Sequence, residues 1–156
     1  MEALDIVSRV VHVATAIVVL GGSIFIRFVL MPAAALLPEE EDRTLSHKIM
    51  GTWKVLVMIG IVLFLGSGFY NYLVVSLPNH RGDSPYNALM GIKILLAFGI
   101  FFLLSALTGR ATAFEGIRNN SKLWLNITIL LGVLVVAIAG DGGFQHGLAV
   151  AFQVHP

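Results

Sequence analysis

The sequence predicts an all-α integral membrane protein, an up-down-up-down bundle of four transmembrane helices that forms a single domain over residues 1–156. Of the 156 residues, 57% are hydrophobic and only 12% are charged, whereas soluble domains carry about 25% charged residues. The charges lie in short stretches between apolar runs of about 18–25 residues, which are long enough to cross ~30 Å of hydrocarbon as helices. Strands of a membrane barrel would be shorter and would alternate in polarity.

Polar connections divide the chain into four expected helices, over about residues 5–31, 45–77, 85–108 and 122–139. Pro32 and the acidic run at 38–42 are expected to end the first helix, and the turn-rich stretch 78–85 the second. A polar loop at 109–121 separates the third helix from the fourth, and Gly140-Asp141-Gly142-Gly143 is expected to stop the fourth. Short connections favour antiparallel neighbours in one bundle.

Lysine and arginine are distributed unevenly between the two sides of the predicted bundle. One side carries Arg27, Arg43, Lys48, Lys54, Arg110, Arg118 and Lys122; the other has Arg9 and Arg81, with Lys93 inside a helix. Because cytoplasmic loops of membrane proteins are enriched in these residues, the first side is predicted to be cytoplasmic. The sequence therefore suggests a multi-pass protein of the bacterial inner (plasma) membrane with both termini in the periplasm.

Composition also excludes several functional classes. The chain has no cysteine, which rules out disulfides, thiolate catalysis and cysteine-based metal sites. Its net charge of +1 gives no basic surface for nucleic acid. The expected surroundings are the lipid bilayer, with a homo-oligomer or a membrane redox partner as further possibilities.

Two ionisable residues lie inside apolar segments, His12 in the first expected helix and Lys93 in the third. Each follows the start of its helix by a similar number of residues, which places both on the order of 10–12 Å below the same membrane surface. Ionisable groups inside a membrane are costly, so a functional role is the default hypothesis. The matching depth predicts one site that the two side chains share.

The helix faces support a polar cavity around this pair. Small residues, including Gly22, continue the His12 stripe at helical spacing and allow close approach of a helix or a flat ligand. Tyr86 lies on the Lys93 stripe, and the second helix brings Ser67 and Asn71 to the same half of the membrane. The predicted cofactor-binding residues are His12, Lys93, Tyr86, Ser67, Asn71 and Gly22.

A planar iron porphyrin suits such a cavity, because a neutral imidazole is a common axial ligand and bundle sites are built from facing helices. His12 and Lys93 are the predicted metal ligands, although Lys93 can instead pair with a haem propionate. The alternatives are that His12 only donates to a backbone carbonyl and that Lys93 extends to the surface.

The remaining histidines have weaker patterns. His47 is expected at the cytoplasmic end of the second helix, as a surface residue or a second haem ligand. His80, His146 and His155 suggest copper only in combination with Met31 or Met90, and Met31 lies on the opposite side. Arg27 is expected to reach the cytoplasmic headgroups, and Asn126 to bond across helices. Four aromatic residues near the predicted interfaces are interpreted as membrane anchors: Trp53, Tyr70, Tyr72 and Trp124.

Three segments together resemble the CopD-like and HemJ-like membrane proteins. The first expected helix has His12, then Gly21-Gly22 and the aromatic Phe25, with Arg27 and Pro32 at its exit. The second ends with Gly66-Ser-Gly68-Phe-Tyr70-Asn71, which is similar to the Gly-x-Tyr-Asn ending of the family. The third starts with Tyr86-Asn-Ala-Leu89-Met-Gly-Ile-Lys93, which resembles the Tyr-Gly-x-Leu-x-x-Lys start of the family. The chain departs from the family pattern in having Val18 and Val19 where a tryptophan is often found.

The resemblance implies a four-helix haem b protein in which a histidine and a lysine at the positions of His12 and Lys93 are the functional pair. The activity it implies is electron transfer or HemJ-like porphyrinogen oxidation, an oxidoreductase reaction. A CopD-like copper transport or handling module and a non-catalytic membrane assembly subunit are the competing expectations.

Overall fold

The chain is helical throughout the part that the structure describes. The computed structural model describes the backbone of residues 2–79 and 84–152, and side-chain surroundings for residues 3–78 and 86–140. No strand occurs within those backbone ranges. The elements in chain order are α1 (Glu2–Phe25), the π-helical η1 (Ile26–Leu30), α2 (Met31–Ala34), α3 (Glu39–Tyr70), the π-helical η2 (Asn71–Ser76), α4 (Leu77–Asn79), α5 (Ser84–Thr108), the 3-10 helix η3 (Thr112–Phe114), α6 (Glu115–Asn119) and α7 (Ser121–Phe152).

Four helical stretches are long and apolar enough to cross a membrane, as the sequence predicts: Ala3–Ala34, Glu39–Ser76, Tyr86–Thr108 and Ser121–Gly140. The second has 38 residues and is therefore roughly 57 Å long at 1.5 Å per residue. A hydrocarbon layer of ~30 Å covers only about half of that length. The charged start of α3 therefore lies outside the apolar layer in any spanning arrangement.

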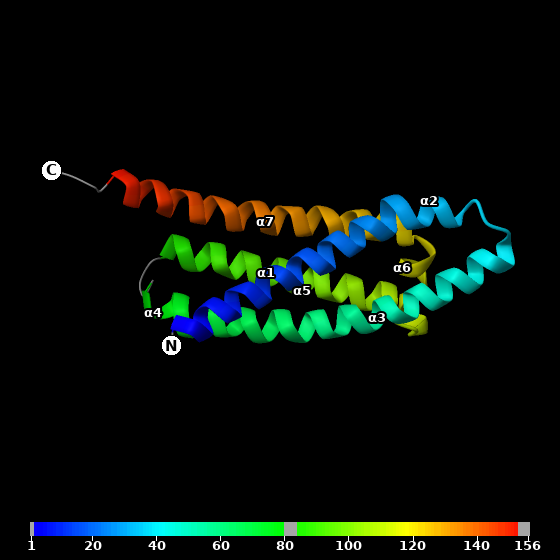
Figure 1. The fold of residues 1–156 in the computed structure, drawn as a ribbon, viewed down its shortest axis with the longest axis horizontal. Helices are drawn as coiled ribbons and strands as arrows, with labels where there is room; N and C mark the ends of the chain where they lie inside the picture. The colour runs from blue at the N-terminus through cyan, green and yellow to red at the C-terminus, as the bar shows by residue number, and fades with distance from the viewer. Residues whose placement is uncertain (1, 80–83, 153–156) are drawn as a thin grey trace.

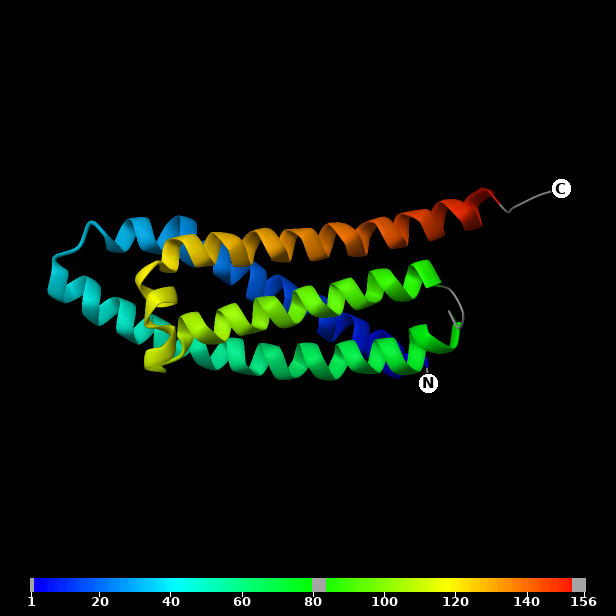
Figure 2. The same ribbon diagram turned by 180° about the vertical axis from the view of Figure 1, so that it is seen from behind.

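The long helices lie alongside one another, and their connections gather at the two ends of an elongated molecule (Figure 1). The start of α1, the short α4 and the start of α5 lie at one end, whereas α2, the start of α3 and α6 lie at the other. Seen from behind, α5 and α7 run side by side and α1 crosses obliquely behind them (Figure 2). Side chains of α1, α3, α5 and α7 can therefore meet in the same interior space.

Several expected helix boundaries are wrong. The acidic run at 39–42 forms the first turn of α3 rather than a loop, because carboxylates near a helix N-terminus are stabilised by the helix dipole. The backbone of α7 continues to Phe152, so the glycine-rich segment at 140–143 does not end it. Glycine in a helix costs about 1 kcal/mol relative to alanine, yet it keeps its N–H donor and therefore weakens a helix without breaking it.

Both π-helical segments precede a proline that the helix contains. Pro32 has no N–H to donate to the carbonyl of Phe28, which lies inside η1. Pro78 likewise cannot donate to Val74, inside η2. A proline ring also crowds the carbonyl four residues earlier, and a widened turn accommodates both effects. The first helix therefore passes through Pro32 to Ala34 instead of ending at about Met31.

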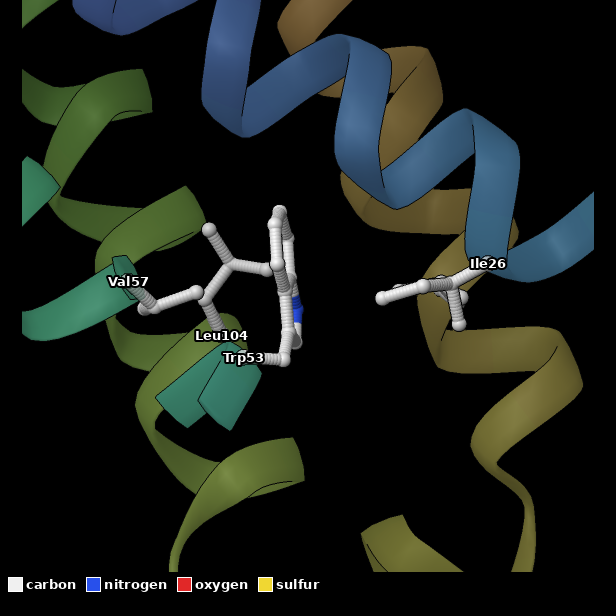
Figure 3. Packing of buried hydrophobic residues seen from close by; sticks show 5 residues of the cluster. Ile26, Trp53, Val57 and Leu104 are labelled. Atoms are coloured by element: carbon white, nitrogen blue, oxygen red, sulfur yellow. The ribbon is translucent and has the colours of Figure 1, made fainter. Parts of the chain in front are cut away.

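The buried core lies in the half of the molecule near α6. Val57 and Leu104 are almost fully buried, and Trp53, Ile26 and Leu125 complete the cluster. Figure 3 shows the indole of Trp53 next to Val57 and Leu104, with Ile26 pointing towards them from η1. The interpretation of Trp53 as a membrane-interface anchor is therefore wrong, because its ring fills the space between α1 and α5.

Close approach of α1 to α3 depends on two glycines. A Cβ at Gly22 would overlap the Trp53 ring, and a Cβ at Gly60 would lie 2.9 Å from Cγ2 of Val19. Buried hydroxyls beside this contact, those of Thr15 and Ser23, donate to carbonyls one turn earlier at 2.7 Å each. The hydroxyls are thereby satisfied within an apolar environment, and small residues allow the tight packing typical of membrane helices.

Candidate functional site

A cavity of about 260 Å³ lies between all four long helices, in the half of the molecule away from the Trp53 core. His12 lines it from α1, Phe64 from α3, Asn71 from η2, Lys93 from α5 and Val135 from α7. Most of the remaining lining is apolar, with phenylalanine and aliphatic side chains from α3 and α5. The structure thus brings His12, Lys93 and Asn71 of the predicted site together around one cavity.

His12 is held against one face of α3. Its ring centroid lies 3.9 Å from that of Phe64, and the two planes are tilted by 44°. Nδ1 of His12 lies 3.0 Å from Oγ of Ser67. Gly68 leaves room for the ring, because a Cβ there would be 3.2 Å from Cε1 of the imidazole. These three α3 residues share one helical face at i, i+3 and i+4 spacing and fix where the imidazole lies.

The hydrogen bonds around Ser67 determine which imidazole nitrogen carries the proton. The Ser67 hydroxyl donates to the carbonyl of Leu63 at 2.6 Å, and a hydroxyl has only one hydrogen to donate. With that hydrogen on the Leu63 carbonyl, the 3.0 Å contact between Nδ1 of His12 and Oγ of Ser67 fits the tautomer in which Nδ1 is the donor. In the neutral ring the other nitrogen, Nε2, then keeps its lone pair. A histidine that binds a metal has this arrangement, with its second nitrogen donating to a nearby acceptor.

Lys93 and Asn71 add polar groups to the apolar lining. Within the described part of the chain, the Lys93 amine makes no hydrogen bond or ion pair with any side chain or carbonyl. The Oδ1 atom of Asn71 is buried and has no hydrogen-bond partner among the described residues. A buried acceptor without a donor costs about 1–3 kcal/mol. Both groups are therefore available to a ligand.

The other predicted site residues lie elsewhere. Ser67 orients His12 but does not line the cavity, and Tyr86, near the start of α5, is not among the lining residues. Gly22 lies ten residues after His12 on the first helix and is therefore roughly 15 Å away, where it packs against Trp53. The structure thus separates Gly22 from the His12 cavity.

Sequence reasoning missed several lining residues, among them Phe64 and Phe101. Phe101 meets Phe64 edge to face, with ring centroids 5.4 Å apart, and so closes one side of the space around His12. Phe64 lies three residues before Ser67, and Phe101 lies eight residues after Lys93. Helical spacing from these two predicted site residues was therefore the signal that could have identified them.

The histidines outside the cavity contribute no metal site in the described residues. His47 is exposed near the start of α3, and the surroundings of His80, His146 and His155 lie outside the described side chains. Among the side chains that are described, no three histidine, aspartate or glutamate residues gather closely enough to hold a metal ion. The copper interpretation based on those three histidines concerns residues beyond the described part.

The side chains that line the cavity suit a haem group, but the cavity volume is small for one. An imidazole and an apolar lining are features of haem sites, and a nearby amine could pair with a propionate. The cavity volume, about 260 Å³, is near the lower limit of small-molecule sites, about 300 Å³, and is small for a complete porphyrin. Phe69 and Phe98 line the cavity and are also exposed on the outer surface, so a larger ring can extend to the lipid on that side.

The chain matches no protein-family model, no curated protein and no solved structure in the three comparisons.

Proposed function

We propose that this chain is a haem b-binding membrane protein with His12 as an axial ligand of the iron. One observation carries the proposal: Nδ1 of His12 lies 3.0 Å from Oγ of Ser67, whose hydroxyl donates to Leu63, beside a cavity that Lys93 also lines. A neutral ring that donates through Nδ1 keeps the lone pair of Nε2 for a metal. A histidine used only to lock helices needs no such cavity. The residue pair is also the one that the CopD-like and HemJ-like resemblance implies.

The protein residues have distinct roles in this proposal. His12 binds the metal, and Ser67 fixes the tautomer and orientation of the ring. Lys93 would either coordinate the iron as well or pair with a propionate, and the phenylalanines that line the cavity would exclude water from the bound haem. A bound haem would supply one-electron exchange, and an apolar surrounding adjusts its reduction potential. Asn71 offers its unpartnered oxygen to an N–H or O–H group of a ligand.

The activity that follows is electron transfer in the bacterial inner membrane, by an up-down-up-down bundle with both termini in the periplasm. Oxidation of a porphyrinogen, with a quinone or a partner chain as electron acceptor, is the enzymatic form that the resemblance implies. This activity is inferred from the similarity between the motifs around His12, Asn71 and Lys93 and those of the CopD-like and HemJ-like proteins.

Copper handling is a second candidate, favoured by Met90. Its thioether lines the same cavity as His12, and an imidazole with a thioether suits Cu(I). This copper site would use His12 and Met90, which lie in the helices around the cavity, and not the loop and tail histidines considered above. A third class, a non-catalytic assembly subunit, corresponds to His12 serving only in its bond to Ser67.

A parallel titration distinguishes the three classes. The full-length protein, purified in mild detergent and freed of cofactor, is titrated with haem and separately with Cu(I). Saturable haem binding with a sharp Soret band supports the proposal. Saturable copper binding without haem binding supports the second candidate and overturns the first. Binding of neither ligand, with circular dichroism showing a folded helical protein, supports the assembly role.

Replacement of Ser67 by alanine is expected to weaken haem binding by about 10- to 100-fold, because the partner that orients a metal-ligating histidine has an effect of that size. The measurement is the same haem titration. Ser76→Ala is the matched control, since Ser76 lines the cavity without bonding to His12. Equal affinities for the two variants would show that the contact between Ser67 and His12 does not orient a ligand.

A further inference from the structure

A second polar site lies on the surface between the first and fourth spans, in the half of the molecule opposite the cavity. Nε of Arg27 donates to Oδ1 of Asn126 at 2.7 Å. Arg27 lies on η1 and Asn126 on α7, and η1 and α7 are in contact. The predicted bond of Asn126 across helices is thereby confirmed, with an arginine as its partner.

The geometry fixes the Arg27 side chain in one orientation. Its Cζ lies 5.2 Å from the ring centroid of Phe28, and its Nε is engaged by Asn126. A guanidinium carries further N–H donors on its two terminal nitrogens. Within the described part of the chain these have no acceptor, and the one ion pair found there joins Arg43 to Glu39. Arg27 therefore presents an oriented pair of donors without a carboxylate partner.

Lys122 adds a second positive charge to this surface. It is exposed and lies four residues before Asn126 on α7, so the two residues share a helix face. Asn126 is five residues inside the span that starts at Ser121, or roughly 8 Å along the helix. At that depth lipid phosphates lie within reach of an extended arginine or lysine side chain.

We propose that Arg27 and Lys122, with Asn126 as the residue that orients Arg27, form a binding site for the phosphate group of an anionic phospholipid. The planar guanidinium matches two phosphate oxygens at once, and basic pockets between membrane helices bind such headgroups. A soluble phosphate has the same chemistry. The lipid is the favoured source because both positive groups lie within apolar spans, near their ends. This inference is independent of any ligand in the His12 cavity.

The test measures lipid selectivity of the full-length protein in detergent micelles. Short-chain phosphatidylglycerol is titrated calorimetrically and compared with phosphatidylcholine of the same chain length and with inorganic phosphate. Wild type is expected to bind phosphatidylglycerol selectively. Arg27→Gln is expected to weaken that binding about tenfold, the size of a lost charge-assisted hydrogen bond. Arg43→Gln removes the same charge from an exposed residue on α3 and is expected to leave binding unchanged.

Two further variants keep the test decisive if Arg27→Gln fails to fold. Lys122→Gln changes an exposed side chain and is expected to weaken binding several-fold, as is Asn126→Ala. Equal binding of the two lipids by wild type overturns the proposal, and so does an equal loss in Lys122→Gln and Arg43→Gln. Inorganic phosphate that competes at the same concentration as the lipid overturns the assignment to a lipid.

Discussion

Gly22→Ala is expected to destabilise the protein by about 1–3 kcal/mol, the usual cost of an extra methyl in a filled core. The added Cβ overlaps the indole of Trp53, which belongs to the same buried cluster as Val57 and Leu104. Because α1 and α3 meet at this point, the strain separates the two helices. The measurement is reversible unfolding in mixed micelles, followed by circular dichroism.

Gly21→Ala is the matched control for this prediction. The same methyl added one residue earlier has no atom within 4 Å, so it is expected to be neutral or to stabilise the helix by up to about 1 kcal/mol. A Trp53→Phe change combined with Gly22→Ala should recover part of the loss, since the smaller ring relieves the overlap. Equal effects of Gly21→Ala and Gly22→Ala would contradict the packing described here.

His12→Ala is expected to abolish the Soret absorption of the haem-loaded protein, since it removes the proposed axial ligand. The lost bond to Ser67 by itself costs only about 0.5–1.5 kcal/mol, so the variant is expected to remain folded. The haem content per chain is measured after purification and again after titration with excess haem. His47→Ala is the control, because His47 is exposed and lies on α3 far from the cavity.

A third variant separates ligation from helix packing at this position. His12→Gln retains a side-chain amide that can donate to Ser67, but it does not provide an imidazole. It is therefore expected to match wild type in stability and His12→Ala in haem loss. Haem content that is unchanged in His12→Ala, or reduced equally in His47→Ala, would exclude His12 as the ligand.

The helices were predictable because hydrophobic length decides whether a helix can span a membrane. The side of α1 that packs on α3 also followed from its small and polar residues at helical spacing, of which Thr15 and Ser23 are buried. Helix ends were less predictable. The acidic first turn of α3 has the composition of a loop, and the glycine-rich segment at 140–143 has the composition of a helix end. The backbone is helical at both.

The site was predictable in part. Matching depth in two helices placed His12 and Lys93 near each other, since rise per residue is fixed, and both residues line one cavity. The error for Gly22 arose because a small residue on the right face can admit either a ligand or a neighbouring side chain, and here Trp53 occupies the space. The π-helical turn that carries Asn71 depends on Pro78, whose effect on the preceding turn is not visible in hydropathy.

The reduced-minus-oxidised absorption spectrum of the wild-type protein, purified in mild detergent from cells grown with a haem precursor, tests the central claim most directly. The account predicts a sharp Soret band and visible bands of a haem b, in proportion to the amount of folded chain. A featureless spectrum from protein that circular dichroism shows to be helical, unchanged after addition of haem, would contradict it.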